Sequence, residues 1–346
     1  MILDVSNLSH GFGDRAIFEN VSFRLLAGEH IGLVGANGEG KSTFMNIVTG
    51  SLMPDEGTVT WAKNVKVGYL DQHTVLEPGM TIAEATSGNT GISFAAVGAA
   101  LGHPVVIYMP DWMSRERIAM MEGYGATVRL VSKEEGGFLG SIRMTEELAQ
   151  KGGVFLPRQF SNPDNSAAHY ETTGAEILRQ LNGLGLRPDG LVAGVGTGGT
   201  VMGLARRLKE ASSACRAFAL EPLNSPTLST GYKVGKHRIQ GISDDFIPDL
   251  LQLSALDGVV SVDDGDAIVA AQMLSRHLGI GVGISSGANL IGAVMAAQRL
   301  GDDPVVITVF SDDNKKYLST DYAGEEPMKD SYYTKDLVLD SVIAHR

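Results

Sequence analysis

The sequence predicts an α/β protein whose larger part forms parallel, doubly wound sheets. Two observations carry this prediction. Short apolar runs of the strand type alternate with segments of helical pattern, and glycine-rich turns join several of these pairs. Strands that alternate with helices are typical of parallel sheets covered by helices on both faces.

Within residues 1–84 we expect strands at 2–5, 21–25, 31–34 and 65–70, and a helix at 44–49. Further along, we expect strands at 81–85, 104–109, 126–131, 154–156, 190–195, 216–220 and 305–310. Helices are expected up to about residue 101, at 115–122 with Ser114 as the N-cap, at 141–150, up to about residue 209, at 266–278 and at 289–300. Residues 82–85 could end the first segment or begin the first strand of the second.

Composition narrows the classes of partner. The chain has 346 residues, of which 43% are hydrophobic and 20% charged, enough for two or three domains with a sizeable core. Its net charge of −12 argues against nucleic-acid binding. No apolar segment is long enough to span a bilayer, and the histidines lack metal-ligand spacing. The single cysteine, Cys215, fits a packing role in a reducing, cytoplasmic setting.

A phosphate-binding motif follows the expected strand at 31–34. The residues Gly35-Ala36-Asn37-Gly38-Glu39-Gly40-Lys41-Ser42-Thr43 fit the pattern G-x-x-x-x-G-K-[ST]. Glycines allow backbone N–H groups to surround a polyphosphate, and the following helix adds the partial positive charge of its N-terminus. We expect Lys41 to reach the β- and γ-phosphates of ATP and Ser42 to hold Mg²⁺.

Residues 1–84 resemble the beginning of an ATP-binding-cassette ATPase, in particular the soluble F-type subfamily. By this resemblance Phe12 stacks on adenine and Gln72 lies near Mg²⁺ and the γ-phosphate. The implied nucleotide site comprises Phe12, Gly35, Asn37, Gly38, Gly40, Lys41, Ser42, Thr43 and Gln72, with Ser42 and Gln72 contacting the metal. The family's helical subdomain, signature motif, Walker B carboxylates and switch histidine do not follow, so binding without hydrolysis is the most that we expect.

Three polar, glycine-containing loops mark the rest of the chain. They are Thr86-Ser87-Gly88-Asn89-Thr90-Gly91, Gly196-Thr197-Gly198-Gly199-Thr200 and Gly283-Ile284-Ser285-Ser286-Gly287-Ala288. The second lies between an expected strand and an expected helix, and suits a phosphate monoester because no lysine follows it. As an isolated motif, an ordinary glycine-rich turn explains it equally well.

Together the three loops resemble cysteine synthase (O-acetylserine sulfhydrylase), a fold-type-II enzyme that uses pyridoxal phosphate (PLP). The segments Ile239-Gln240-Gly241-Ile242, Phe246-Ile247-Pro248 and 312–320 fit the same family. The resemblance covers about residues 85–322. It implies O-acetylserine and sulfide as substrates, β-replacement as the reaction and a homodimer as the assembly.

The resemblance also implies roles for individual residues. Thr86, Ser87, Asn89, Thr90 and Gln159 would bind the substrate α-carboxylate, and Asn89 would also face the phenolic oxygen of PLP. The residues Gly196, Thr197, Gly198, Gly199 and Thr200 would hold the cofactor phosphate. Ser285, with Ser286 as second choice, would bond to the pyridine nitrogen.

The lysine that anchors PLP in this family is missing. It belongs to a Ser-x-Lys-Asp-Arg type motif upstream of the first loop, and this chain has no such motif. The upstream lysines are Lys41, Lys63 and Lys66, and neither Lys63 nor Lys66 is followed by Asp-Arg. Without that lysine the reaction loses its base and its covalent anchor.

The leading hypothesis is therefore a chimera with little or no turnover that keeps some affinity for PLP, held without a covalent bond, or for phosphate. It has an incomplete P-loop segment at 1–84, the remnant of a small domain at 85–161, a large domain at 162–322 and a tail at 323–346. One alternative is an active PLP-dependent synthase with a surrogate lysine. Another is an ATP-binding module, and a fourth is that the chain folds poorly.

Overall fold

The computed structural model describes residues 1–12, 15–35, 39–50, 52–65, 67, 76 and 78–345, except the side chains of Phe12 and Arg15. The chain divides into two compact units, Met1–Val75 (unit 1) and Leu76–Arg346 (unit 2). Among the described residues, no helix combines the length and the apolar character needed to cross a membrane.

Unit 1 is a small antiparallel sheet with one helix against it. Its described strands are β1 (Leu3–Phe12), β2 (Arg15–Leu25) and β3 (Glu56–Trp61), in the order β2-β1-β3. Helix α1 (Lys41–Val48) buries Ile47 and Val48 with three leucine and valine side chains of β1, namely Leu3, Val5 and Leu8. The indole Nε1 of Trp61 donates to the carbonyl of Val48 at 2.9 Å, which fastens β3 to the helix.

The strand expected at 31–34 does not form, so that prediction is wrong. Residues 31–35 lie outside any strand, and Ile31, Leu33 and Val34 are 56%, 45% and 91% exposed. An apolar run becomes a buried strand only where neighbouring strands pair with its backbone. The described strands of unit 1 pair with one another instead. Of the strand expected at 65–70, Val65 and Val67 lie outside any strand and the other residues lie outside the described ones.

The first sheet of unit 2 is parallel. It contains β4 (Thr81–Ala85), β5 (Val105–Pro110), β6 (Thr127–Val131) and β7 (Val154–Phe155), in the order β6-β5-β4-β7. The strands alternate with α2 (Asn89–Leu101), α3 (Arg115–Gly123) and α4 (Gly137–Ala149). Ile82 lies opposite Val105, and Ile82 shares one core with Ile107 and Met121. Residues 82–85 therefore belong to this sheet.

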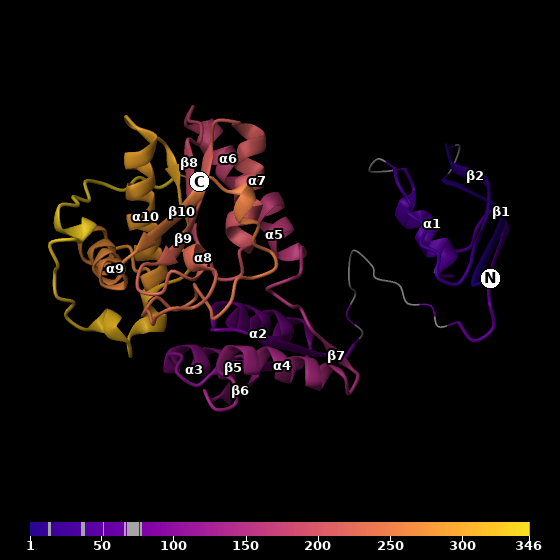
Figure 1. The fold of residues 1–346 in the computed structure, drawn as a ribbon, viewed down its shortest axis with the longest axis horizontal. Coiled ribbons are helices and arrows are strands. Elements are labelled where there is room, and N and C mark those ends of the chain that lie inside the picture. Colours follow the sequence, from indigo (N-terminus) through magenta and orange to yellow (C-terminus); the bar gives the residue numbers. More distant parts are fainter. Residues whose placement is uncertain are drawn as a thin grey trace. The chain divides into compact units, whose positions relative to one another are not determined.

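The second sheet of unit 2 is also parallel and has helices on both faces. Its strands are β8 (Gly190–Gly194), β9 (Arg216–Pro222), β10 (Gly258–Val262) and β11 (Val306–Ile307), in the order β10-β9-β8-β11. Figure 1 shows α9 (Asp264–Leu278) and α10 (Ile284–Leu300) on one side, and α6 (Gly174–Gly183) and α7 (Gly199–Ala211) on the other. Shorter elements are α5 (Asp164–Ala168), the π-helical turn η1 (His169–Thr173), α8 (Thr227–Thr230) and the 3₁₀ turn η2 (Leu253–Ala255). The predicted parallel α/β architecture is confirmed.

Three helices of unit 2 begin earlier than predicted: α4 at Gly137 rather than at residue 141, α9 at Asp264 rather than at residue 266, and α10. Helix α10 begins at Ile284 rather than at residue 289, although its first turn contains serines and a glycine of low helix propensity. Tertiary packing explains the longer helix, because a Cβ at Gly287 would lie 2.1 Å from the carbonyl oxygen of Ala267 in α9. Ser114 stands at the N-cap of α3 as predicted, but its hydroxyl donates to the carbonyl of Lys316 at 2.8 Å and makes no capping bond.

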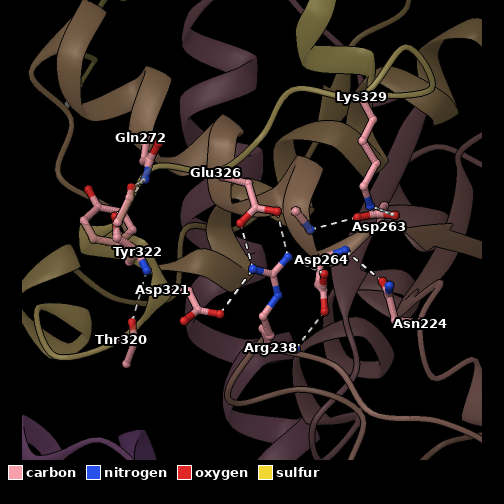
Figure 2. A network of polar contacts seen from close by, with 12 residues as sticks. Asn224, Arg238, Asp263, Asp264, Gln272, Thr320, Asp321, Tyr322, Glu326 and Lys329 are labelled. Carbon is pink, nitrogen blue, oxygen red and sulfur yellow. Dashed lines mark hydrogen bonds and ion pairs between the residues drawn. The ribbon is translucent and has the colours of Figure 1, made fainter.

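The C-terminal segment is fastened to α9 by polar contacts. After the 3₁₀ turns η3 (Asn314–Tyr317) and η4 (Asp321–Ala323), Glu326 forms two hydrogen bonds with the Arg238 guanidinium, at 2.7 and 2.8 Å. Figure 2 shows this guanidinium between Glu326, Asp321 and Asp264. The bonds with Glu326, followed by those with Asp264, raise the pKa of Arg238. The tail then reaches η5 (Tyr333–Lys335), at whose start the backbone N–H of Tyr333 donates to Asp266 of α9 at 2.9 Å.

We expect Glu326→Gln to lower the free energy of unfolding of unit 2 by about 1–2 kcal/mol. Charged hydrogen bonds contribute about 1.5–3 kcal/mol each, and the effect is reduced here because the Arg238 side chain is 35% exposed. The measurement is urea unfolding followed by circular dichroism. Glu325→Gln is the matched control, because Glu325 is exposed and we expect a change below about 0.5 kcal/mol. Equal effects of the two variants would contradict the assigned role of Glu326.

Candidate functional site

A cavity of about 140 Å³ in unit 2 brings the three predicted loops together. Its walls include all but one of the residues that the sequence assigned to PLP and substrate; these are Thr86, Ser87, Asn89, Thr90, Gln159, Gly196, Thr197, Gly198, Thr200 and Ser285. The exception, Gly199, is the first residue of α7 and follows Gly198 directly. Residues that lie up to about 200 positions apart in the chain thus line one space.

The loop between β8 and α7 has the properties of an anion site. Gly198 is the N-cap of α7, with φ 84° and no side chain of its own, and the backbone N–H of Gly199 donates to Thr197 Oγ1 at 3.2 Å. The helix is 13 residues long, and its N-terminus carries a partial positive charge. Gly196 must be a glycine, because a Cβ would lie 2.5 Å from the carbonyl oxygen of Gly241. The Nδ2 of Asn165 donates to Thr197 Oγ1 at 3.0 Å and to the carbonyl of Gln159 at 2.9 Å, which braces the loop.

The loop between β4 and α2 forms another part of the wall of the 140 Å³ cavity. Gly88 has φ 150°, and a Cβ there would lie 2.1 Å from Cδ of Arg117. The backbone N–H of Gly88 donates to Thr86 Oγ1 at 3.1 Å, so the hydroxyl fixes the turn. Asn89 is the first residue of α2, and its Nδ2 donates to Asp312 at 3.1 Å. A second helix N-terminus therefore opens onto the cavity.

Gln159 and the serines at the start of α10 complete the predicted set. Gln159 is 7% exposed, and its Nε2 donates to the carbonyl of Ala85 at 2.5 Å. Ser285, the first choice for the pyridine nitrogen, lines the cavity, whereas Ser286 does not. The Ser286 hydroxyl is fully buried and has no hydrogen-bond partner among the described residues. An unpaired buried hydroxyl is uncommon and carries a desolvation cost.

Two charged residues of the cavity wall were missed by the sequence analysis. Arg117 is 1% exposed and donates to Gln240 at 2.6 Å, and its guanidinium lies 4.4 Å from the Tyr317 ring centroid. Its position between the charged residue Glu116 and Ile118 gave no signal of burial. Asp244 lies between the segments 239–242 and 246–248, whose family resemblance was noticed. Burial and the charge of Asp245 raise the pKa of Asp244 to about 7.

A third carboxyl group lies directly behind the first loop. Glu84 in β4 is 5% exposed, and burial raises its pKa to about 7. The backbone N–H groups of Ala85 and Gln159 donate to its two oxygens at 3.0 and 3.2 Å and favour the charged form. Burial outweighs them, so Glu84 is protonated in a large fraction of molecules at neutral pH.

A larger cavity of about 640 Å³ adjoins the small one. The two share Ser87, Gly241, Ile242 and Asp244 in their walls. Lys133, Lys233 and Lys236 line the larger cavity. Elsewhere, Cys215 is buried and its thiol pKa is raised to about 11, which fits the predicted packing role.

The predicted nucleotide site of unit 1 is described only in part. Asn37, Gly38 and Gln72 lie outside the described residues, as does the side chain of Phe12. Gly40 is the N-cap of α1 with φ 85°, and Lys41, Ser42 and Thr43 form the first turn of that helix. The ammonium of Lys41 donates to the carbonyl of Gly35 at 2.7 Å. The described residues contain no group of three or more His, Cys, Asp or Glu that could hold a metal ion.

Known proteins match this chain over most of its length. The sequence profile of the family described as "Pyridoxal-phosphate dependent enzyme" matches residues 57–312. A probable cysteine synthase of Bacillus subtilis (strain 168) is 41% identical over 252 residues, which cover 72% of this chain and 80% of the relative. A cysteine synthase of Staphylococcus aureus (strain Mu50) is 40% identical over 245 residues, which cover 71% and 78%.

Solved structures of enzymes also match this chain over most of its length. The hydrogen sulfide-producing enzyme from Fusobacterium nucleatum is 61% identical, with a TM-score of 0.73, over 75% of this chain and 78% of that chain. O-ureido-L-serine synthase is 38% identical, with a TM-score of 0.68, over 74% and 80%.

The raised pKa of Glu84 predicts a pH-dependent stability of unit 2. A carboxyl group whose pKa is about 7 when folded and 4.5 when unfolded stabilises the fold fully below pH 4.5, and this stability is lost as pH rises through 7. We therefore expect the stability of the wild type relative to Glu84→Gln to fall by about 3 kcal/mol between pH 4.5 and 8.

The measurement is urea unfolding at a series of pH values in a Trp61→Phe background. The chain has two tryptophans, so the fluorescence of Trp112 then reports unit 2 alone. Glu122→Gln, at an exposed position of α3, is the control and should give a difference that does not vary with pH. If the difference in free energy of unfolding between the wild type and Glu84→Gln is also independent of pH, folding does not raise the pKa of Glu84.

Proposed function

Because this chain belongs to the family of pyridoxal-phosphate dependent enzymes, we propose that it binds PLP in the 140 Å³ cavity and carries out β-replacement at most slowly. The resemblance to cysteine synthase that the motifs predicted is confirmed by the matches over residues 57–312. The observation that carries the proposal is the convergence of the three loops on one cavity. The proposed substrates are O-acetylserine and sulfide.

The residues present fit a phosphate-bearing pyridine. The N-terminus of α7, with Gly196, Thr197 and Thr200, suits the phosphate dianion. Ser285 offers a hydroxyl to the pyridine nitrogen, and a neutral hydroxyl leaves that nitrogen unprotonated. When bound, PLP supplies an electron sink that eases the departure of a β-substituent from an amino acid.

The loop at the start of α2 is proposed to bind the α-carboxylate. Thr86, Ser87, Asn89 and Thr90 all line the cavity, and the helix N-terminus favours a negative charge there. Gln159, which lines the same cavity, is proposed as a second contact for the substrate α-carboxylate. With the PLP phosphate held at α7 and the substrate carboxylate held at α2, the substrate would be oriented and water would be excluded from the space between the two helix N-termini.

Slow turnover is proposed because the usual lysine is missing from the sequence. A positioned general base contributes roughly 10²- to 10⁴-fold to the rate. The residues proposed to bind PLP and the substrate lie within unit 2 and are still present, although the usual lysine is missing. A homodimer and a cytoplasmic location belong to the same proposal, the latter supported by a buried Cys215 that forms no disulfide.

We also propose that the chain is a chimera, with unit 1 derived from an ATP-binding-cassette ATPase. The P-loop motif and the start of α1 at Lys41 support this origin. The remnant of a small domain at 85–161 and the large domain at 162–322 are supported by the two parallel sheets on either side of residue 161. We propose Val75 rather than residue 84 as the end of the ATPase-like segment, which is supported by the pairing of β4 with β5 and β7.

PLP binding tests the main proposal. We expect saturable binding of one PLP per chain, measured by equilibrium dialysis. Thr200→Val should weaken it about tenfold, because a hydrogen bond to a charged group contributes about 1.5 kcal/mol. Thr172→Val, on the exposed side of η1, should leave the affinity unchanged. In a parallel assay, cysteine formation from O-acetylserine and sulfide should lie at least about 10²-fold below that of intact relatives. Absence of saturable PLP binding would refute the proposal.

A second candidate function is ATP binding without hydrolysis, favoured by the position of Lys41 at the start of α1 next to Gly35. We expect weak binding of a fluorescent ATP analogue that is lost in Lys41→Ala and kept in Lys63→Ala, a variant at an exposed lysine of the same unit. No phosphate should be released. If the unchanged chain does not bind the analogue, this candidate is excluded.

A further inference from the structure

Lys316 is tied to the wall of the small cavity by both its backbone and its side chain. Its carbonyl oxygen accepts hydrogen bonds from Ser114 at 2.8 Å and from Arg117 at 3.3 Å. Its ammonium donates to Oδ1 of Asn89 at 3.2 Å. Arg117 and Asn89 both line the cavity, and Lys316 is half-buried. The amine thus lies one hydrogen bond away from a residue of the proposed PLP site.

The residues around Lys316 fix the orientation of the Asn89 amide, which is the partner of the Lys316 ammonium. Nδ2 of Asn89 donates to Asp312, which leaves Oδ1 for the lysine. Asp312 is also bonded to Tyr317 at 2.9 Å and paired with Arg117 at 3.5 Å. The recorded partner of the Lys316 ammonium is therefore a neutral amide oxygen.

Four other lysines of unit 2, namely Lys209, Lys233, Lys329 and Lys335, are paired with carboxylates. Lys209 pairs with Asp257 at 2.6 Å and Lys329 with Asp263 at 3.4 Å. Among the described residues, no carboxylate oxygen lies within 4 Å of the Lys316 ammonium. Only the unprotonated amine is a nucleophile, so Lys316 must release its proton before it reacts.

We propose that Lys316 is the residue that binds PLP covalently in this chain, an inference that rests on the proposed PLP site. In PLP the aldehyde and the phenolic oxygen are on neighbouring ring carbons, and Asn89 is the proposed partner of that oxygen. The Lys316 amine, after releasing its proton to solvent, adds to the aldehyde carbon. One water leaves and a C=N bond remains, so no oxidant or reductant is required.

The lysines of the larger cavity are the competitors for this role. Lys133, Lys233 and Lys236 line a space that shares Asp244 with the small cavity. Lys233 is paired with Asp245, and the Lys133 ammonium lies 5.6 Å from the Trp112 ring centroid. None of the three has a recorded contact with Asn89 or Arg117, whereas Lys316 contacts both.

The test is reduction of the full-length chain with borohydride in the presence of equimolar PLP, followed by digestion and mass spectrometry. Hydride converts the C=N bond to a stable secondary amine, so the modified lysine keeps its label. We expect the label on the peptide that contains Lys316. Lys316→Arg keeps the positive charge and should lose this label, while Lys315→Arg, at the exposed neighbouring position, should keep it. Both variants should unfold at the same temperature as the wild type.

Pyridoxine 5′-phosphate separates this inference from the proposed function, because it has an alcohol in place of the aldehyde. It should bind the wild type and Lys316→Arg equally, and the affinity of Lys316→Arg for PLP should fall to the same value. If neither compound binds, the proposed function fails. If both bind and the label lies on Lys133, Lys233 or Lys236, or is spread over many lysines, only the role of Lys316 is overturned.

Discussion

The buried ion pair between Arg117 and Asp312 is the interaction on which the small cavity depends. Its two side chains are 1% and 0% exposed. A buried pair offsets its desolvation cost only when further hydrogen bonds satisfy both groups. Arg117 meets this condition through Gln240 and the Tyr317 ring. Asp312 meets it at Oδ2, which accepts from the Tyr317 hydroxyl and from Asn89, whereas its buried Oδ1 has no hydrogen-bond partner among the described residues. Because Arg117 belongs to α3 and Asp312 follows β11, the pair joins the helices of the first sheet to the end of the second.

The same polar system continues to the tail. Gln240 follows Arg238 by two positions, and the segment between them is anchored by Ile239, which is fully buried. Glu326 holds Arg238 on one side of this segment, and Arg117 holds Gln240 on the other. Gly241 and Asp244 then line both cavities. This part of the wall, which lies against Gly196 of the loop before α7, is therefore positioned by contacts from the tail and from α3, and its shape depends on segments far apart in the sequence.

Local signals made much of this architecture predictable. The alternation of strands and helices in unit 2 and the three loops follow from residue type and order, whereas the choice of Ser285 over Ser286 came from the resemblance to cysteine synthase and stays a prediction. Predictions failed where distant contacts decide the outcome. The run 31–34 reads as a buried strand but no described strand pairs with it. The contact of Lys316 with Asn89 spans 227 positions, so a search limited to lysines upstream of the first loop could not find it.

Binding and chemistry depend on different parts of this chain. The residues proposed to bind the cofactor phosphate, at the start of α7, and the substrate carboxylate, at the start of α2, all lie within unit 2, and both helix N-termini favour negative charge. Chemistry requires in addition an amine within hydrogen-bond reach of the proton that it moves. Lys316 has its backbone fixed by Ser114 and Arg117, and its ammonium is bonded to Asn89. In the proposal, the Lys316 amine reacts with the aldehyde of bound PLP. The Lys316 residue also holds Ser114, Arg117 and Asn89 in place, so it is not positioned for this reaction alone. Retained cofactor affinity with slow turnover is the behaviour that such a site should show.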